Sequence, residues 1–449
     1  MKRPAIEDVR VVELKPSPNN ARTHSIKQIT QIAKSIKRFG FRVPILVSAN
    51  HEIIAGHARA EAAKQAGLKV VPTIRIDDLS EAEVRAFMIA DNKLAENAGW
   101  DYEILAQEFE WLGSMELEFD LTLTGFETGE IDVILDDAND TAESDPNDEF
   151  AGLDEGAAPV TRPGDLWICG NHRLICGNAL DLETYERLMG NETAQAVFTD
   201  PPYNVPIDGH VCGSGKVKHR EFAMAVGEMS KAEFGTFLSG SLGLMAKHSA
   251  PGAIHFVCMD WRHLPELLAA GADVYSAFLN LCVWAKNNGG MGSLYRSQHE
   301  LVLVFKAGEG PHINNVELGK HGRYRTNVWN YAGINSFSAS RDEDLAMHPT
   351  VKPVAMVADA IKDVTHRGGI VLDGFAGSGT TLVAAHETGR KGWGVELDPV
   401  YCDVILKRLS IVVGTEPVLE ATGQKFSEVA NERAQSLDAS NEGGTSDAA

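Results

Sequence analysis

The 449-residue chain contains only six cysteines, and no two of them form a Cys-x-x-Cys pair. This absence argues against a zinc site and against a disulfide framework, so we expect no metal and free thiols in a reducing compartment. No apolar run approaches the roughly 18 residues that a membrane span requires. No signal-peptide pattern appears at the first residues either. We therefore expect a soluble, cytoplasmic protein without membrane contact.

Basic residues are also scarce, since 41 lysines and arginines stand against 63 acidic residues, for a formal net charge of −22. Most of this excess lies in two polar segments. Residues 121–165 carry 13 acidic side chains and one basic one, and residues 416–449 carry seven and two. The rest of the chain is close to neutral. A protein of this composition can bind nucleic acid only through local basic loops, not through its overall field.

The two acidic segments also suggest how the chain is divided. Residues 136–164 are rich in Asp, Glu, Pro, Ala and Gly and lack helical or strand periodicity, which is typical of a linker. The end of the chain is polar, and we expect its last dozen residues to be disordered. The predicted parts are an N-terminal domain over 1–120, an acidic linker over 121–165, a larger domain over 166–415 and a polar tail over 416–449.

The most informative motif is Thr-Asp-Pro-Pro-Tyr-Asn at residues 199–204, which follows a short apolar strand pattern. Two prolines stiffen the backbone there. The carboxylate of Asp200 and the adjacent carbonyl can accept N–H bonds from an amino group, and the ring of Tyr203 can stack on a flat substrate. The motif resembles the Asp-Pro-Pro-Tyr segment of amino-methylating DNA methyltransferases. This resemblance implies a catalytic set formed by Asp200, Pro201, Pro202 and Tyr203.

A second motif covers residues 369–381, where an apolar strand pattern leads into Asp373, a Gly-rich turn and a helix pattern. Glycines let the backbone approach a ligand closely at a helix N-terminus. The next strand pattern ends at Glu396, where a carboxylate can chelate ribose hydroxyls. The motif is not the G-x-G-x-x-G dinucleotide fingerprint. It resembles the cofactor motif of S-adenosylmethionine-dependent methyltransferases.

Two further segments resemble cofactor segments of the same family. Residues 348–353 read His-Pro-Thr-Val-Lys-Pro and match the segment that helps to hold the methionine end of the cofactor, where Lys352 supplies a cation for the carboxylate. Residues 177–181 match a segment near the cofactor adenine, although Asn178 replaces the usual first acid. The cofactor set that these resemblances imply is Asp181, Lys352, Asp373, Phe375, Gly377, Gly379, Thr380 and Glu396.

The motif around Asp200 precedes the cofactor motif, an order that the family calls the β arrangement. Between them, residues 281–286 and 299–306 resemble the strands that flank the flipped-base pocket. Residues 307–347 interleave cations with aromatic and amide side chains, which suits phosphates and base edges. A loop over 206–228 is a second candidate for DNA contact. The DNA-binding residues expected from the first segment are Lys320, Arg323, Arg325 and Arg341.

The N-terminal part has its own α/β rhythm. Apolar residues at helical spacing predict an amphipathic helix over 26–36 that stops at Gly40, and another helix pattern covers 81–95. The box Gly-His-Ala-Arg at residues 56–59 opens a helix, where free N–H groups form a fair cradle for phosphate. Strand patterns cover residues 9–14, 43–48, 52–55 and 70–76.

These features resemble the ParB-like and sulfiredoxin-like domain. Sulfiredoxin needs a cysteine in the box, and no cysteine occurs in residues 1–168, which excludes that chemistry. In ParB proteins the box and a later Asn-bearing helix hold a nucleotide. The resemblance therefore implies a nucleotide site at Gly56, Arg59 and Asn92, while a structural ion pair for Arg59 stays equally open.

We therefore expect an α/β protein with a doubly wound, Rossmann-like methyltransferase sheet and a separate ParB/sulfiredoxin-like α+β domain. The resemblance identifies the chain as a bacterial or phage-borne β-group DNA amino-methyltransferase. It would flip a base out of double-stranded DNA and methylate it with S-adenosylmethionine. The acid at position 200 favours adenine N6 over cytosine N4. A role on RNA or a protein amide, a non-catalytic ParB-like DNA-binding regulator, a homodimer and a cognate restriction endonuclease stay open.

Overall fold

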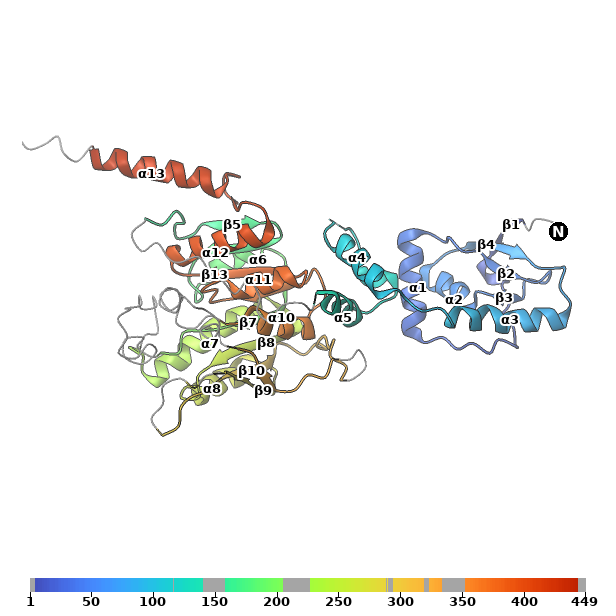
Figure 1. Ribbon diagram of the computed structural model, residues 1–449, viewed down its shortest axis with the longest axis horizontal. Coiled ribbons are helices and arrows are strands. Elements are labelled where there is room, and N and C mark those ends of the chain that lie inside the picture. Colours follow the sequence, from blue (N-terminus) through green and yellow to red (C-terminus); the bar gives the residue numbers. More distant parts are fainter. Residues whose placement is uncertain are drawn as a thin grey trace, which may run out of the picture. The chain divides into compact units, whose positions relative to one another are not determined.

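The computed structural model of the chain describes residues 5–115, 117–139, 158–204, 227–287, 289, 294–318, 323–332 and 352–442 (Figure 1). The chain divides into two compact units, Met1–Asp140 and Thr141–Ala449. Each unit has its own sheet and its own apolar core. This organisation agrees with the expected separation of an N-terminal domain from a larger α/β domain.

The sheet of the N-terminal unit consists of β1 (Ile6–Arg10), β2 (Ile45–Val47), β3 (Ile53–Ala55) and β4 (Val70–Arg75). The strands lie in the order β1-β4-β2-β3. The central pair, β2 and β4, is parallel, and the two outer strands pair antiparallel with their neighbours. Branched side chains such as Val9, Ile45 and Val71 form the core of this unit together with two alanines of the second helix. The sheet is therefore mixed, as an α+β domain requires.

Three helices accompany this sheet, namely α1 (Ile26–Phe39), α2 (His57–Ala66) and α3 (Glu81–Glu96). α1 starts after Ser25, whose hydroxyl accepts a hydrogen bond from the N–H of Gln28, and it ends at Gly40 with a φ of 83°. The helices predicted over 26–36 and 81–95 are thus confirmed. The strand predicted over 9–14 is wrong in its second half, because Val11–Glu13 form the 3-10 turn η1.

The N-terminal unit continues into a helical pair, α4 (Tyr102–Gly113) and α5 (Thr128–Asn139), joined by the 3-10 turn η2 (Leu121–Thr124). Buried apolar side chains, among them Phe109, Leu121 and Ile131, form a core shared by these elements. The linker predicted over 121–165 is therefore wrong for residues 121–139. Its acidic residues misled the interpretation, because Asp136 and Asp137 lie on the exposed side of an amphipathic helix.

The described part of the C-terminal unit contains a ten-stranded sheet in the order β11-β9-β10-β8-β7-β12-β13-β6-β5-β14. The five central strands, from β8 to β6 in this order, run parallel, and most of the flanking pairs are antiparallel. The strands are β5 (Leu166–Cys169), β6 (His172–Cys176), β7 (Ala194–Thr199), β8 (Ser249–Met259), β9 (Ala277–Ala285), β10 (His299–Lys306), β11 (Val328–Asn330), β12 (Ile370–Asp373), β13 (Lys391–Glu396) and β14 (Val418–Leu419).

Helices cover both faces of this sheet (Figure 1). One core contains α10 (Val354–Val364), α11 (Thr380–Glu387) and α12 (Pro399–Val413). The core on the other face contains α6 (Leu182–Met189), α7 (Lys231–Lys247) and α8 (Leu264–Val274). Strands that are buried on both faces explain the continuous apolar runs in the sequence. The doubly wound α/β prediction is confirmed.

Strand register fixes where the two principal motifs lie. β7 and β12 are adjacent and parallel, with Ala196 beside Val371 and Val197 beside Leu372. The residues that follow these strands therefore emerge at the same, carboxyl edge of the sheet, where open α/β folds bind ligands. β8 runs parallel to β7 on its other side, so the residues after Met259 emerge at this edge as well.

Part of the predicted polar tail is ordered. β14 pairs with β5, and α13 (Phe426–Glu442) follows it. The ring of Phe426 lies 5.3 Å from that of Trp167, and Arg433 forms an ion pair with Asp165. The disorder predicted for the last dozen residues is wrong for residues 438–442, which belong to α13, and the last seven residues lie outside the described residues.

None of the helices in the described ranges is both long and apolar enough to cross a membrane. The same residues contain no cluster of three or more His, Cys, Asp or Glu side chains arranged to hold a metal ion. The cysteines that the structure describes are buried free thiols.

Candidate active site

Asp200 lies directly after β7, at the carboxyl edge of the sheet, and the buried Pro201 follows it. Its Oδ1 accepts a hydrogen bond of 2.5 Å from the hydroxyl of Tyr203. The same hydroxyl lies 3.4 Å from Oε2 of Glu300, at the start of β10. Because proline fixes its own φ, the turn holds the carboxylate and the aromatic ring in one arrangement. The structure thus brings Asp200 and Tyr203 together, as predicted.

Asn204 closes this turn on the other side. It adopts a left-handed φ of 54°, a conformation that asparagine tolerates better than most residues. Its Oδ1 accepts from the N–H groups of Gly227 and Met229, and its Nδ2 donates to the carbonyl of Met229 at 2.8 Å. The turn after β7 is therefore tied to the segment that leads into α7.

A buried ion cluster surrounds Asp200. The ammonium of Lys352 lies 2.5 Å from Oδ2 of Asp200 and 3.0 Å from Oε2 of Glu300. The other carboxylate oxygen of Glu300 accepts a short hydrogen bond from Lys286, at the end of β9. Lys352 has only 5% of its side chain exposed, and Glu300 has 12%. Two carboxylates and two ammonium groups thus alternate along one chain of contacts, which satisfies the rule that buried charges are paired.

The cluster shifts the pKa values of its members. Burial disfavours the charged form of Glu300, but the ammonium groups of Lys352 and Lys286 outweigh it and hold its pKa low, at about 2. Burial also raises the pKa of Asp200, and the adjacent Lys352 opposes this shift. For Lys352 the two carboxylates overcome the effect of burial and raise the pKa of the ammonium. Glu300 and Lys352 therefore exist as ions at neutral pH.

The sequence predicts that the ammonium of Lys352 pairs with the carboxylate of the cofactor, and this stays a prediction. In the structure it lies between Asp200 and Glu300, with its Nζ 5.8 Å from the ring centroid of Tyr203. The reason is topological, because the residue immediately precedes α10, which packs on β7 and β8, and this places it beside the catalytic turn.

Asp373 ends β12 and is almost fully buried, with 4% exposed. Its Oδ1 accepts from the hydroxyl of Thr199 at 2.8 Å and from the N–H of Phe375 at 3.0 Å, and its Oδ2 accepts from the hydroxyl of Thr381 at 2.7 Å. Burial raises its pKa to about 6. The sequence suggested a carboxylate that faces the ligand; in the structure it links β7, the Gly-rich turn and α11.

Glu396 ends β13 beside the Gly-rich turn. Its Oε2 accepts from the N–H of Gly377 at 2.8 Å, and its Oε1 accepts from the N–H of Asp398 at 2.9 Å. Burial raises its pKa to about 7. Gly377 has a left-handed φ of 53°, which a side chain would strain. The carboxylate and the turn therefore lie together at the edge that the two motifs share.

The remaining predicted cofactor residues line the same turn. Gly379 is the N-cap of α11 with a φ of 81°, and a Cβ there would lie 2.9 Å from the side chain of Ile405. Thr380 is buried at the first turn of α11, and Phe375 packs against Phe237 of α7 with ring centroids 5.7 Å apart. Glycine at 379 is thus required both by φ and by space.

Asp181 lies apart from these contacts. It is exposed and caps α6, where its carboxylate accepts from the N–H of Glu183 at 3.2 Å and from the hydroxyl of Thr184 at 3.3 Å. β6, which leads to it, pairs with β13, and the N–H of Gly177 donates to the carbonyl of Glu396. This backbone contact brings the segment of Asp181 to the side of the sheet edge where Glu396 ends.

The residues present fit S-adenosylmethionine by their chemistry. A ribose needs carboxylate or carbonyl acceptors at a strand end, and Glu396 supplies one. A planar base needs an apolar surface, and the half-buried Phe375 supplies one. The glycines at 377 and 379 leave the backbone of the turn without side chains that would fill the approach to α11. The side chains that would hold the cofactor are therefore Glu396 and Phe375, with the backbone of residues 374–379.

The residues predicted for DNA recognition behave differently. Arg323 donates to Asp363 at 2.7 Å, and Arg325 donates to Asp363 and Asp359 at 3.0 Å each. Arg325 also contacts the hydroxyl of Tyr331. These arginines hold a segment against α10, and their contact with phosphates stays a prediction. Lys320, Arg341 and most of the loop over 206–228 lie outside the described residues.

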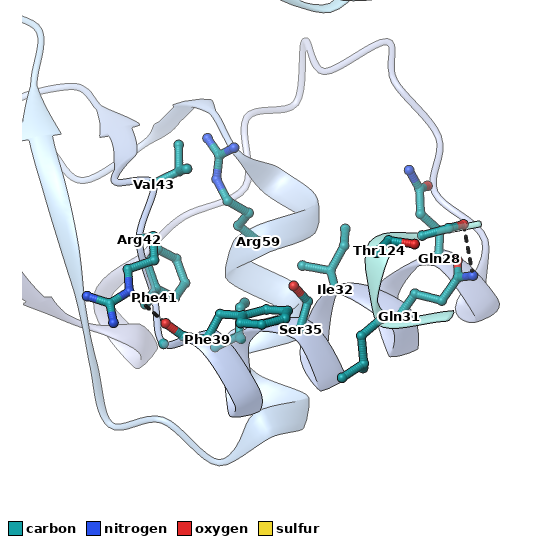
Figure 2. Close-up of a pocket in the computed structure, with 14 residues that line it drawn as sticks. Gln28, Gln31, Ile32, Ser35, Phe39, Phe41, Arg42, Val43, Arg59 and Thr124 are labelled. Carbon is teal, nitrogen blue, oxygen red and sulfur yellow. Dashed lines mark hydrogen bonds between the residues drawn. The ribbon is translucent and has the colours of Figure 1, made fainter. Parts of the chain in front are cut away.

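The N-terminal unit has a cavity of its own, of about 530 Å³, between α1, the segment 39–43 and η2 (Figure 2). Arg59 lies on the Val43 side of this cavity, and Gln28 and Thr124 lie at the opposite side. The Nη2 of Arg59 donates to the carbonyl of Pro44 at 3.4 Å, and its buried Nε is one of the few side-chain atoms of the described residues without a hydrogen-bond partner.

The three residues predicted for the nucleotide site are thus only partly brought together. Gly56 has a φ of 102°, and a Cβ there would lie 3.0 Å from the guanidinium of Arg59, so this glycine makes room for the arginine. Asn92 does not line the cavity; its Nδ2 donates to the carbonyl of Met88, one turn earlier in α3.

Glu300 and Lys286 are site residues that the sequence patterns did not predict. Their strands resemble those beside the base pocket, but the resemblance gives the two side chains no role. A signal was present, because Lys286 follows one apolar run and Glu300 starts the next. When two consecutive strands pair antiparallel, the residue that ends the first strand lies beside the residue that starts the second.

Comparison with known proteins adds the family. A model described as DNA methylase matches residues 194–407. Models described as the ParB N-terminal domain and the ParB-methyltransferase HTH domain match residues 1–93 and 103–163. The second of these covers α4, η2 and α5, which explains why the chain is helical where a linker was expected.

Two curated relatives agree with these matches. The putative methylase YubD of Escherichia coli K12 is 48% identical over 216 residues, which are 48% of this chain and 82% of that protein. The ParB-like nuclease domain-containing protein YnaK of the same strain is 44% identical over 71 residues, 16% of this chain and 82% of that protein. Among solved structures, a putative DNA modification methylase from Thermus thermophilus, complexed with S-adenosyl-L-methionine, is 20% identical with a TM-score of 0.37; the match covers 54% of this chain and 94% of that one.

Proposed function

The chain belongs to the N6/N4 DNA methylase family and carries a ParB-type N-terminal domain, and from this premise we propose that it methylates adenine N6 in double-stranded DNA. The observation that carries the proposal is the shared edge of β7 and β12. It puts the Asp200–Tyr203 turn beside the Gly-rich turn that begins at Asp373. The amino group and the methyl donor would therefore meet at one edge of the sheet.

Asp200 would act on the amino group of the target base. The lone pair of such an amine is conjugated into the ring, so the free amine is a poor nucleophile. When Asp200 and the carbonyl beside Pro201 accept its two N–H bonds, the nitrogen becomes more tetrahedral and its lone pair is exposed. The adjacent ammonium of Lys352 favours the ionised form of Asp200, in which the carboxylate is a strong acceptor.

Tyr203 would hold the base. Its ring is half-buried beside the carboxylates of Asp200 and Glu300, and its hydroxyl is already used by them. The face of the ring is therefore what remains for stacking on a base that has left the duplex. S-adenosylmethionine supplies the activated methyl group in this family. Glu396 and Phe375 would orient its ribose and adenine.

The residues after β8 are a further candidate for DNA contact beside the segment over 307–347; Arg262 there also pairs with Asp260 at 3.4 Å. Trp261 has 53% of its surface exposed, and the guanidinium of Arg262 lies 5.0 Å from the centre of its ring. Because β8 is parallel to β7, both residues emerge at the same edge as Asp200. An exposed aromatic ring and a cation suit an unstacked base and a phosphate.

Adenine is favoured over cytosine by the acid at position 200, which the resemblance associates with N6 methylation. A purine also offers a larger face to Tyr203. Transfer can be tested with plasmid DNA and S-adenosylmethionine labelled in the methyl group, comparing the wild type with Asp200→Ala, which removes the acceptor. We expect label in the DNA with the wild type only, and equal cofactor affinity for both proteins. Label that enters RNA or protein but not DNA, or normal transfer by the variant, would refute the proposal.

For the N-terminal unit we propose nucleotide binding at the cavity beside Arg59. The support is the guanidinium at its wall, whose Nε has no hydrogen-bond partner. An arginine of this kind suits phosphate oxygens. Titration of the full chain with ribonucleoside triphosphates should show binding that Arg59→Ala abolishes. Arg75→Ala is the matched control, because Arg75 forms an exposed pair with Glu7 outside the cavity. Equal binding by both variants would exclude this site.

A further inference from the structure

Both oxygens of Asp200 are engaged by side chains in this structure. Tyr203 donates to Oδ1, and the ammonium of Lys352 lies 2.5 Å from Oδ2. Under the proposed function, a target amine must approach this same carboxylate. An amine nitrogen and the Nζ of Lys352 cannot take the same position on Oδ2. Where the amine takes the position that Lys352 holds on Oδ2, the base binds only after Lys352 has withdrawn from that oxygen.

A withdrawing lysine needs another counter-ion. Lys352 has only 5% of its side chain exposed, and a buried ammonium that loses its partner carries a large desolvation penalty. Glu300 already lies 3.0 Å from the same ammonium. Its carboxylate is ionised, because two ammonium groups hold its pKa low. Lys352 can consequently leave Asp200 and stay paired without leaving the cluster.

We infer that Glu300 is a positioning residue of the methyl transfer: it receives Lys352 when the target amine replaces that lysine on Asp200. Lys286 has a supporting part, since it holds the other oxygen of Glu300 and so fixes the carboxylate toward Lys352. Tyr203 joins the two carboxylates through one hydroxyl, at 2.5 Å from Asp200 and 3.4 Å from Glu300. This inference rests on the proposed function, because it concerns the acceptor for the amine.

The sign of the effect of Glu300 depends on Lys352, and this makes the inference testable. In Glu300→Gln, Asp200 is the single carboxylate partner that Lys352 keeps among the described contacts. The ion pair between Lys352 and Asp200, which the amine must open, therefore becomes stronger. With Lys352→Met, nothing blocks Asp200, and Glu300 becomes a second buried carboxylate beside it. Like charges at this distance destabilise each other. Removal of Glu300 should then cause no further loss.

The experiment is a double-mutant cycle on the full chain, with Glu300→Gln, Lys352→Met and the double variant. The readouts are single-turnover methylation of DNA at saturating cofactor, and S-adenosylmethionine affinity by calorimetry. We expect Glu300→Gln to lower the rate about tenfold with cofactor affinity unchanged within about twofold, a coupling of ordinary size for neighbouring residues. In the Lys352→Met background the same change should leave the rate equal or higher.

A charge-matched control covers the case in which Glu300→Gln alone does not fold. In Glu300→Gln with Lys286→Met, one carboxylate and one ammonium remain, so the cluster stays neutral. We expect this variant to be slow as well, because the receiving carboxylate is absent, and Glu300→Asp to recover most of the rate.

Three results would overturn the inference: an equal loss in both Lys352 backgrounds, a wild-type rate for Glu300→Gln, or a wild-type rate for the charge-matched variant. Absence of methyl transfer by the wild type would instead refute the proposed function, so the two failures are distinguishable.

Discussion

Replacement of Asp373 discriminates between a carboxylate that faces the cofactor and one that organises its loop. Three donors converge on it: the hydroxyls of Thr199 and Thr381 and the N–H of Phe375. Asp373→Ala leaves all three without their acceptor in a buried place. Asp373→Asn keeps the shape and one oxygen that can accept from Thr199 and Phe375, and the hydroxyl of Thr381 can turn to accept from the new amide.

The magnitudes separate the two variants. A buried donor that loses its partner costs about 1–3 kcal/mol, so Asp373→Ala should weaken the local structure by about 4 kcal/mol. Burial of the carboxylate works in the other direction. The pKa of Asp373 rises to about 6 from an ordinary value of 3.8, which corresponds to about 3 kcal/mol against the charged form. Both variants avoid this cost, so the value of about 4 kcal/mol for Asp373→Ala is the net loss after three donors lose their acceptor, and Asp373→Asn should stay within about 1 kcal/mol of the wild type.

Hydrogen exchange of the peptides that cover β12 and α11 is the appropriate assay, because it reports local opening in a chain with two units. Exchange should accelerate strongly in Asp373→Ala and little in Asp373→Asn. Cofactor affinity by calorimetry should fall in the first variant and stay within about threefold in the second. If Asp373→Asn loses cofactor binding while its exchange is unchanged, the carboxylate contacts the ligand and our interpretation is wrong.

Three other changes test separate parts of the structure. The pKa of Glu396 is raised to about 7, so the carboxylate should gain a proton as the pH falls from 8 to 6, and cofactor affinity should weaken. Glu396→Gln should bind the cofactor weakly at both pH values. Wild-type affinity that does not change with pH would contradict this. Arg325→Met should destabilise the C-terminal unit by about 3 kcal/mol, because the buried carboxylate of Asp363 loses one of its cationic partners. Unchanged thermal stability together with a reduced salt dependence of DNA binding would contradict this. Deletion of residues 1–140 should leave a folded unit that binds cofactor, and an insoluble product would refute the division.

The sequence was sufficient for the fold and for the two motif strands. Apolar strand patterns that run into Asp200 and Asp373 predict parallel strands whose ends meet, and the pairing of β7 with β12 confirms this. Gly379 was also predictable, because a helix that starts at a Gly-rich turn needs a residue that accepts positive φ.

The partners of charged side chains were not predictable. Arg323 and Arg325 look like DNA contacts because they stand among aromatic residues. Their acidic partner Asp363 lies about 40 positions later and comes close only when α10 packs on the sheet. Lys352 is a similar case, since the motif fixes its position in the chain but not the carboxylates of Asp200 and Glu300 that it meets.

Composition misled the interpretation of the acidic segments. Residues 121–139 carry many acids, but Ile131, Ile134 and Leu135 lie at the i, i+3, i+4 spacing of one helix face and form a core with α4. The same holds after residue 416, where Phe426 packs on Trp167. A helix with many acidic residues on its exposed face has the composition of a linker, and only the spacing of its apolar residues distinguishes the two.

The most direct test of the whole account is the identity of the methylated nucleoside. DNA incubated with the wild-type protein and S-adenosylmethionine should be digested to nucleosides and analysed by mass spectrometry, with Asp200→Ala as the control. The account predicts N6-methyladenine that depends on the wild-type enzyme and is absent with the variant. A dominant N4-methylcytosine peak would contradict the base assignment, and no methylated nucleoside at all would contradict the proposal that this site methylates DNA.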